Sequence, residues 1–289
     1  MPAGAVAGWI RGRALLRRRL GPAGTRQLTA AGSVAGAVQQ LAGTSYGHAV
    51  RPGMALPAAQ RAVDSTLLWT LRILAGWQPP GQAATVRVLA GRFEIANTVD
   101  LLIALHGGER PEPFELGSLS TAWTRVRAAG TPPGVRSALR RSEWGDPGAD
   151  DPGSVLLALQ LAWAARVFEQ VPPAAGWARD AVMLEVRHMR SVGAAPPTDP
   201  WLQRPIERVL GRRPRAVEPG APGPGDRAAW WRSVEEEARV MTAGRPGPAA
   251  TVGIIGLLSA DAWRVRAALA LAGAPAGGAS EAVLPDAVA

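Results

Sequence analysis

The residues with the strongest catalytic potential lie in the stretch Gly43-Thr-Ser-Tyr-Gly47, which His48 follows. The spacing Gly-x-Ser-x-Gly is typical of a nucleophile elbow, in which a serine hydroxyl attacks a carbonyl carbon and a histidine takes the proton. That chemistry needs a strand-to-helix turn above a sheet, with an acid and a histidine placed downstream. No strand pattern precedes Gly43, and His48 is merely the next residue. The stretch therefore predicts a turn at the end of a helix.

Other patterns that carry chemistry are missing from the sequence. The chain has no cysteine and no lysine, which excludes a thiolate metal site, a cysteine nucleophile and a phosphate-binding loop of the Walker type. The three histidines do not have the His-Glu-x-x-His spacing of a zinc site. The acidic run 235–237 is predicted on the solvated face of its helix, and Asp150-Asp151 in a loop. We therefore expect no catalytic residues, no metal and no cofactor, because a helical enzyme would need a convergent acid, base and nucleophile.

One helix, predicted over 86–108, organises the chain. Its apolar residues recur at helical spacing and predict a single buried stripe. The stripe consists of Leu89, Phe93, Ala96, Val99 and Ile103. Gly107-Gly108 supplies the glycine that commonly follows a helix end. Asn97 lies beside the stripe, where it could bond a neighbouring helix end or simply face solvent.

The other predicted elements are also helices. They cover 5–20, 25–41, 57–75, a short segment with Trp123 and Val126, 134–144, 155–170, 174–192, 200–210, 227–241, 251–258 and 261–272. We expect Gly21-Pro22 to end the first helix, Ser118 or Ser120 to cap the short segment, and Ser154 to cap 155–170. The helix 155–170 is apolar almost all round, so we expect it to be central. Runs of β-branched residues with a period of two are missing, and the sequence predicts an all-α fold.

The domain organisation follows from composition. We expect one domain over 1–272 that is built of helical repeats. A Pro/Gly/Arg segment over 212–225 is predicted to be a flexible linker, and 273–289 a disordered tail. The apolar run 152–165 is shorter than the roughly 20 residues that a membrane span needs.

The net charge of +9 is concentrated near the N-terminus. Eight arginines precede Asp64, the first acidic residue. Such a basic region can bind a nucleic acid, an anionic lipid surface or an acidic protein, or it can be a solvated helix without a partner. The abundance of Ala, Gly, Pro and Arg also agrees with a GC-rich genome. Arg17-Arg18-Arg19 has the form of a twin-arginine export signal, but Pro22 and Arg26 stand where an apolar segment should follow.

Short segments of the sequence echo one another. Arg11-Gly-Arg-Ala-Leu-Leu16 matches Arg264-Val-Arg-Ala-Ala-Leu269, and each follows a tryptophan closely. Phe93-Glu-Ile95 matches Leu184-Glu-Val186. Because these amphipathic segments are spread along the chain, they suggest duplicated helical lobes.

These segments, taken in order, resemble the rotor-adaptor family of archaeal-type and vacuolar-type rotary ATPases. The matching stretches are the Arg-x-Arg-Ala helix 11–16, the turn 41–47, the helix 93–108, the loop 113–119, the segment 183–186, and the segment 253–261 with Trp263-Arg-Val-Arg266. The resemblance implies a non-catalytic body of three similar helical lobes that form a funnel. It also implies a stiff adaptor in the central stalk that passes torque between the central shaft and the membrane ring.

The resemblance also implies partners and a location. They are the shaft subunits and the proteolipid ring of a V-type or A-type ATPase, with peripheral attachment at the cytoplasmic face of the cell membrane and a role in proton or ion transport. No small-molecule substrate and no nucleic acid are expected in that role. The candidate interaction residues are Arg11, Arg13, Arg17, Arg18, Arg19, Tyr46, Asn97, Arg264 and Arg266. The alternative function is an Arg-rich helical nucleic-acid-binding protein, whose affinity would fall steeply with salt.

Overall fold

The computed structural model describes residues 3–191, 200–211 and 224–274. In these ranges the chain forms helices and their connections without any strand, which confirms the all-α prediction. Most of the predicted linker 212–225, Val192 and nearly all of the predicted tail 273–289 lie outside the described residues. The sequence predicted a single domain over 1–272. The contacts divide the chain into unit 1, from residues 1–83 and 223–289, and unit 2, from residues 84–222.

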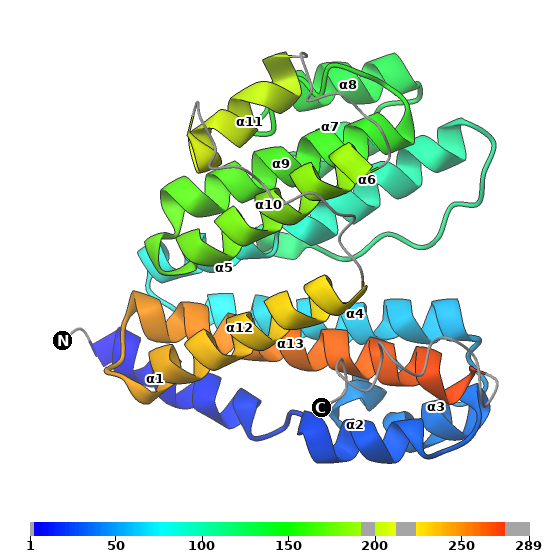
Figure 1. Cartoon of the computed structure of the whole chain (residues 1–289), viewed down its shortest axis with the longest axis vertical. Coiled ribbons are helices and arrows are strands. Elements are labelled where there is room, and N and C mark those ends of the chain that lie inside the picture. The colour runs from blue at the N-terminus through cyan, green and yellow to red at the C-terminus, as the bar shows by residue number, and fades with distance from the viewer. Residues whose placement is uncertain (1–2, 192–199, 212–223, 275–289) are drawn as a thin grey trace. The chain divides into compact units, whose positions relative to one another are not determined.

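Unit 1 combines the two ends of the chain. Its elements are α1 (Ala3–Leu16), α2 (Gly21–Thr29), α3 (Val34–Ala42), the 3-10 helix η1 (Ser45–His48), α4 (Leu56–Gly76), α12 (Pro224–Ala243) and α13 (Pro248–Ala272). Helix α13 is central, because α1, α2, α3, α4 and α12 all pack against it (Figure 1). Helix α5 (Pro80–Leu89) crosses the boundary between the two units.

Helix α13 is continuous, whereas the sequence predicted two helices over 251–258 and 261–272. The reason is that Ser259 and Ala260 join the two segments without proline or glycine, so nothing interrupts the helical hydrogen bonds. Side chains are buried on almost every side of α13, as expected for a helix surrounded by others. At Gly253, an added Cβ would lie 2.7 Å from the Ala238 carbonyl oxygen of α12, so the missing side chain permits the close approach of the two helices.

Unit 2 is formed by one continuous stretch of chain. It contains α6 (Gly91–Leu105), η2 (Gly117–Leu119), α7 (Trp123–Arg127), α8 (Pro132–Arg140), α9 (Pro152–Gln170), η3 (Pro172–Ala174), α10 (Ala175–Ser191) and α11 (Pro200–Leu210). Helix α9 packs against α6, α10 and α11, which confirms the prediction that it is central (Figure 1). Its core residues include Val155, Leu159 and Leu161.

Several predicted helix ends were wrong. Gly21-Pro22 begins α2 instead of ending a helix, since proline is well tolerated in the first helical turn. The predicted helix 25–41 is interrupted, and Ser33 caps the start of α3. Asp151, and not Ser154, caps α9; its carboxylate accepts the Ser154 backbone N–H, and this hydrogen bond lowers the pKa of Asp151.

Within the described ranges, none of the helices combines the length and apolar character that crossing a membrane requires.

Candidate functional site

Asp261 is the centre of the most connected polar cluster in unit 1. Its side chain projects from the middle of α13 and is 1% exposed. One carboxylate oxygen accepts the Gly21 backbone N–H at 2.8 Å, and the other accepts the Leu20 backbone N–H at 3.1 Å. Leu20 has right-handed helical angles and Gly21 has a φ of +69°, so their N–H groups form a concave nest that suits an anion. The carboxylate therefore anchors the start of α2 to the central helix.

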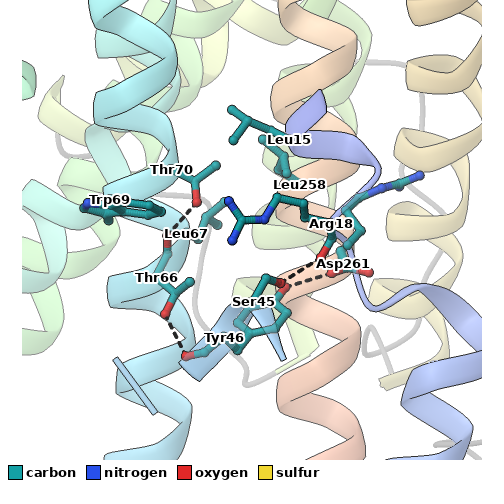
Figure 2. Close-up of a pocket in the computed structure, with 11 residues that line it drawn as sticks. Leu15, Arg18, Ser45, Tyr46, Thr66, Leu67, Trp69, Thr70, Leu258 and Asp261 are labelled. Carbon is teal, nitrogen blue, oxygen red and sulfur yellow. Dashed lines mark hydrogen bonds between the residues drawn. The ribbon is translucent and has the colours of Figure 1, made fainter. Parts of the chain in front are cut away.

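Tyr46 binds the same carboxylate from the 3-10 helix η1. Its hydroxyl donates to Oδ2 of Asp261 at 2.8 Å, and the side chain is 6% exposed (Figure 2). The Thr66 hydroxyl of α4 reaches the backbone carbonyl of Tyr46 at 3.3 Å. The tyrosine thus connects three segments of unit 1 around one buried negative charge.

A small cavity lies beside this cluster. Its volume is about 40 Å³, which is enough for water but not for an organic substrate. The lining residues named in Figure 2 come from α1 and the turn after it, from η1, from α4 and from α13. Figure 2 also shows the side chain of Arg18 extending across the cavity toward Trp69 and Thr70 of α4.

The serine of the Gly-x-Ser-x-Gly stretch lies in this region, in the helix-ending turn that the sequence predicted. The Ser45 hydroxyl donates to the Arg18 backbone carbonyl at 2.7 Å. His48 instead stacks on Trp69, with ring centroids 4.0 Å apart. Serine and histidine are therefore both engaged in contacts other than the hydroxyl-to-imidazole bond of a catalytic pair.

The surroundings of Tyr46 raise its pKa well above the ordinary value for tyrosine. Burial is the main cause, and the negative charge of Asp261 together with the hydrogen bond to it adds to the effect. Tyr46 is the only tyrosine of the chain, and the chain lacks lysine and cysteine. Because arginine titrates above pH about 12, this phenol is the only side chain that normally titrates near pH 10.

We expect stability to fall as the pH rises above about 10, because the unfolded chain then loses the phenolic proton while the folded chain keeps it. The slope approaches about 1.4 kcal/mol per pH unit until the pKa of the folded state is reached. Tyr46→Phe removes the slope. Tyrosinate absorbance measured through alkaline titration tests this expectation: the native protein should show a delayed signal, and the chain unfolded in guanidinium an ordinary one. Equal titration curves would contradict the buried hydrogen bond.

Unit 2 contains a second buried carboxylate with a comparable role. Glu94, on α6, is 2% exposed. It accepts the backbone N–H of Thr121 at 2.9 Å and the backbone N–H groups of Ala122 and Trp123, at the start of α7. The prediction that Ser118 or Ser120 caps this helix was wrong, since its cap residue Ala122 makes no side-chain bond and Glu94 supplies the acceptor.

Asn97 lies one turn further along α6 and holds the loop before α7. Its amide nitrogen donates to the Phe114 carbonyl at 2.9 Å, and its amide oxygen accepts the Phe114 N–H at 2.7 Å. The residue is 1% exposed, so the alternative that it faces solvent was wrong. Asn97 and Glu94 together fix the chain from Phe114 to Trp123 onto α6.

The predicted helix 86–108 is divided at Ala90 between the end of α5 and the whole of α6, and its buried face differs from the predicted stripe. Ile103 is 39% exposed, and Leu89, Ala96 and Val99 are half-buried. Apart from Phe93, the buried residues of this helix are Gly91, Glu94, Ile95, Asn97, Thr98, Leu101 and Leu102. The predicted stripe placed polar residues outward, but here two polar side chains face inward because they satisfy backbone groups of the following loop.

A third carboxylate pairs with one of the predicted interaction residues. Glu235 of α12 is 5% exposed, so the prediction of a fully solvated acidic run was wrong at this position. It bonds the guanidinium of Arg264 on α13, which is itself 5% exposed, and that of Arg239 at 2.8 Å. Arg266 is more accessible and pairs with Asp64 of α4 at 2.8 Å. Both arginines are thus engaged in contacts within unit 1.

The remaining predicted interaction residues are arginines of α1 and the turn after it. Arg11, Arg13, Arg17 and Arg18 are exposed, and Arg19 is half-buried with its Nε bonded to the Leu16 carbonyl. The guanidinium of Arg11 lies 5.4 Å from the Trp77 ring centroid, and that of Arg13 lies 5.0 Å from the Trp9 ring centroid. These arginines are the members of the predicted set that are available to a partner.

Unit 2 also has a larger cavity of about 510 Å³, between α9, α11 and the loop after α8. Trp144 and Trp201 line it together with charged groups of both signs, such as Arg204 and Glu207. Across the described part of the chain, no three histidine or acidic side chains come together as a metal site would require. The main polar clusters among the described residues are the buried carboxylates that accept hydrogen bonds from backbone N–H groups.

Sequence reasoning missed Glu94 and Asp261 as key residues. Both belong to an acidic-x-x-polar pattern in an otherwise apolar helix, Glu94-x-x-Asn97 and Asp261-x-x-Arg264. In each case the second residue also makes a buried polar contact, Asn97 with Phe114 and Arg264 with Glu235. An acidic residue that interrupts an apolar face is the signal that could have identified them.

Comparison with known proteins leaves the family open, as the chain matches neither a protein-family model nor a curated protein.

Proposed function

We propose that this chain is a non-catalytic adaptor of a rotary ATPase of the archaeal or vacuolar type, placed between the central shaft and the proteolipid ring. The single observation that carries the proposal is that segments that resemble those of the rotor-adaptor family contact one another through buried polar groups. The turn 41–47 meets the segment 253–261 through the Tyr46–Asp261 hydrogen bond. The segment 93–108 meets the loop 113–119 through Asn97 and Phe114.

This arrangement supports a mechanical role. Residues in the segments that resemble the family, such as Tyr46 and Asn97, hold other backbone segments in place. A body that transmits torque needs such internal stiffness. Close-packed helices resist deformation, and buried carboxylates with several donors hold their helix ends in one geometry. The cavity described beside the Tyr46–Asp261 cluster has a volume of about 40 Å³, a size that suits water and agrees with a structural use of these residues.

The proposal includes the finer architecture that the resemblance implies, a funnel of three similar lobes. Units 1 and 2 are candidates for such lobes, since each has a central helix and a buried carboxylate that anchors the start of another helix. The proposed location is the cytoplasmic face of the cell membrane, reached through the complex.

The deciding experiment is reconstitution with the shaft and ring proteins encoded by neighbouring genes. We expect the purified chain to co-elute with both, and to bridge shaft and ring when all three are mixed. Absence of binding to either protein, by a chain whose helical circular dichroism is intact, would overturn the proposal. A gene neighbourhood without head, shaft and proteolipid genes would argue against it as well.

The three arginines of the turn after α1 should contribute to that assembly. Replacing Arg17, Arg18 and Arg19 with glutamine removes three positive charges, so we expect weaker co-elution at physiological salt, by roughly tenfold in affinity if the partner surface is acidic. A matched control replaces Arg110, Arg125 and Arg127, which are exposed in unit 2. Unchanged assembly of the first variant would show that this region makes no interface.

A nucleic-acid-binding function is the second candidate, and one observation favours it. The described residues of unit 1 hold fifteen arginines against six acidic residues, and three of those acids, Asp64, Glu235 and Asp261, are buried. Duplex binding through phosphate contacts would weaken steeply with salt, because released counterions drive it. Salt titration of duplex binding separates this function from the adaptor role.

A further inference from the structure

One side of α1 combines exposed arginines with an exposed apolar side chain. The residues concerned, called here the N-terminal basic face, are Ile10, Arg11, Arg13, Ala14 and Arg17, and all five are exposed. Ile10 is 57% exposed. Helical spacing places Ile10 and Ala14 near the middle of this face, with Arg13 and Arg17 along one side and Arg11 along the other.

The opposite side of α1 packs onto unit 1 and fixes the orientation of the helix. Ala5, Gly8 and Gly12 are buried there. A Cβ at Gly12 would lie 2.5 Å from Cδ1 of Ile254 on α13, so the helix rests closely on the central helix. The N-terminal basic face is therefore held outward by packing.

The charge of this face is not balanced by nearby acids in the sequence. No acidic residue occurs before Asp64, and Asp64 is paired with Arg266. The contacts that hold Arg11 and Arg13 are with the rings of Trp77 and Trp9, which position the guanidinium groups without neutralising them. An anionic partner would meet three positive charges, two of which the tryptophan rings hold in place.

We infer that the N-terminal basic face binds an anionic lipid surface. At such a surface the guanidinium groups lie at the level of the lipid phosphates, while a central apolar side chain enters the boundary of the acyl chains. A nucleic-acid backbone offers charge but gives no comparable environment for Ile10. The combination of Ile10 with flanking arginines therefore favours a headgroup layer over a duplex.

This binding does not depend on the adaptor role, because protein and lipid alone are enough to test it. Unit 1 would lie with α1 against the headgroup layer, held mainly by attraction between the arginines and the lipid phosphates. Failure of the shaft and ring reconstitution would leave this inference standing, and the reverse also holds.

The experiment uses the full chain and vesicles of phosphatidylcholine with or without phosphatidylglycerol. We expect co-sedimentation with vesicles that contain phosphatidylglycerol, reduced at high salt, and little with phosphatidylcholine alone. Each arginine near an anionic surface contributes about fivefold in affinity. The variant with Arg11, Arg13 and Arg17 replaced by glutamine should therefore bind on the order of a hundredfold more weakly.

Two further variants make the test specific. The control with glutamine at 110, 125 and 127 has the same net charge as the first variant and should retain most of the binding. Ile10→Ser should weaken vesicle binding several-fold and leave duplex binding at the same salt unchanged. Equal losses in the two triple variants, or full vesicle binding by Ile10→Ser, would overturn the inference. Duplex binding without vesicle binding would do so too, in favour of a nucleic-acid surface.

Discussion

Glu94→Ala is expected to lower the free energy of unfolding of unit 2 by at least about 3 kcal/mol. The replacement removes the acceptor of three backbone N–H groups, those of Thr121, Ala122 and Trp123. Leaving a buried donor unsatisfied costs about 1–3 kcal/mol for each group, and bonds to a charged acceptor are at the upper end. The loss exceeds that of an ordinary helix cap, which is typically about 1 kcal/mol, because one carboxylate serves three donors.

Hydrogen exchange resolved by peptide is the appropriate measurement, since a chain with two compact units need not unfold in one step. Amides from Phe114 to Val126 should lose protection first, while peptides of α13 stay protected. Glu94→Gln, which keeps one acceptor oxygen, should show a smaller loss. The control Glu109→Ala changes an exposed carboxylate of the same unit and should shift stability by no more than about 0.5 kcal/mol. Equal protection in Glu94→Ala and in the control would refute the anchoring role.

Glu235→Ala should destabilise unit 1 by about 3–5 kcal/mol. It leaves the guanidinium of Arg264 buried between α12 and α13 without its carboxylate, and an unpaired buried charge is costly. Glu236→Ala, on the exposed side of the same helix, is the matched control. Chemical denaturation followed by far-ultraviolet circular dichroism measures both variants.

Replacing both Glu235 and Arg264 should lower the free energy of unfolding less than replacing either partner alone. A double variant with Glu235→Leu and Arg264→Met removes both charges while keeping similar volume, so we expect it to recover much of the loss. The same variant tests whether Arg264 belongs to an interface. A stable double variant that still assembles with shaft and ring would show that Arg264 acts only inside the fold. A stable double variant that fails to assemble would indicate that Arg264 contributes to the interface.

The sequence predicted the helical character well because apolar residues repeat at helical spacing through most of the chain. The bounds of α4 and α11 differ from the prediction by no more than a residue, and the central position of α9 followed from its apolar composition. Local signals were enough for these elements. Proline and glycine were less reliable, since Gly21-Pro22 was expected to end the first helix and instead begins the second.

The candidate site was harder to predict because its partners are distant in the sequence. Asp261 bonds a backbone N–H that lies 240 positions earlier, and Glu94 bonds one 29 positions later. A helical wheel assigns such charged residues to the solvent. For this reason the predicted buried face of α6 was wrong, and Glu235 was expected on a solvated face. Only the folded arrangement shows that backbone donors and the guanidinium of Arg264 lie opposite these carboxylates.

Because unit 1 is built from both ends of the chain, it cannot be completed on the ribosome until the C-terminal helices have been translated. Unit 2 is one continuous stretch and can fold as soon as it has emerged, whereas α1 to α4 must wait for α13, the helix on which they pack. Until Asp261 is translated, the nest at Leu20 and Gly21 lacks its anion and the apolar faces of the first helices are uncovered. The nascent N-terminal segment therefore exposes apolar surface until translation is nearly complete, and a chain that ends before α13 would leave α1 to α4 without the helix on which they pack.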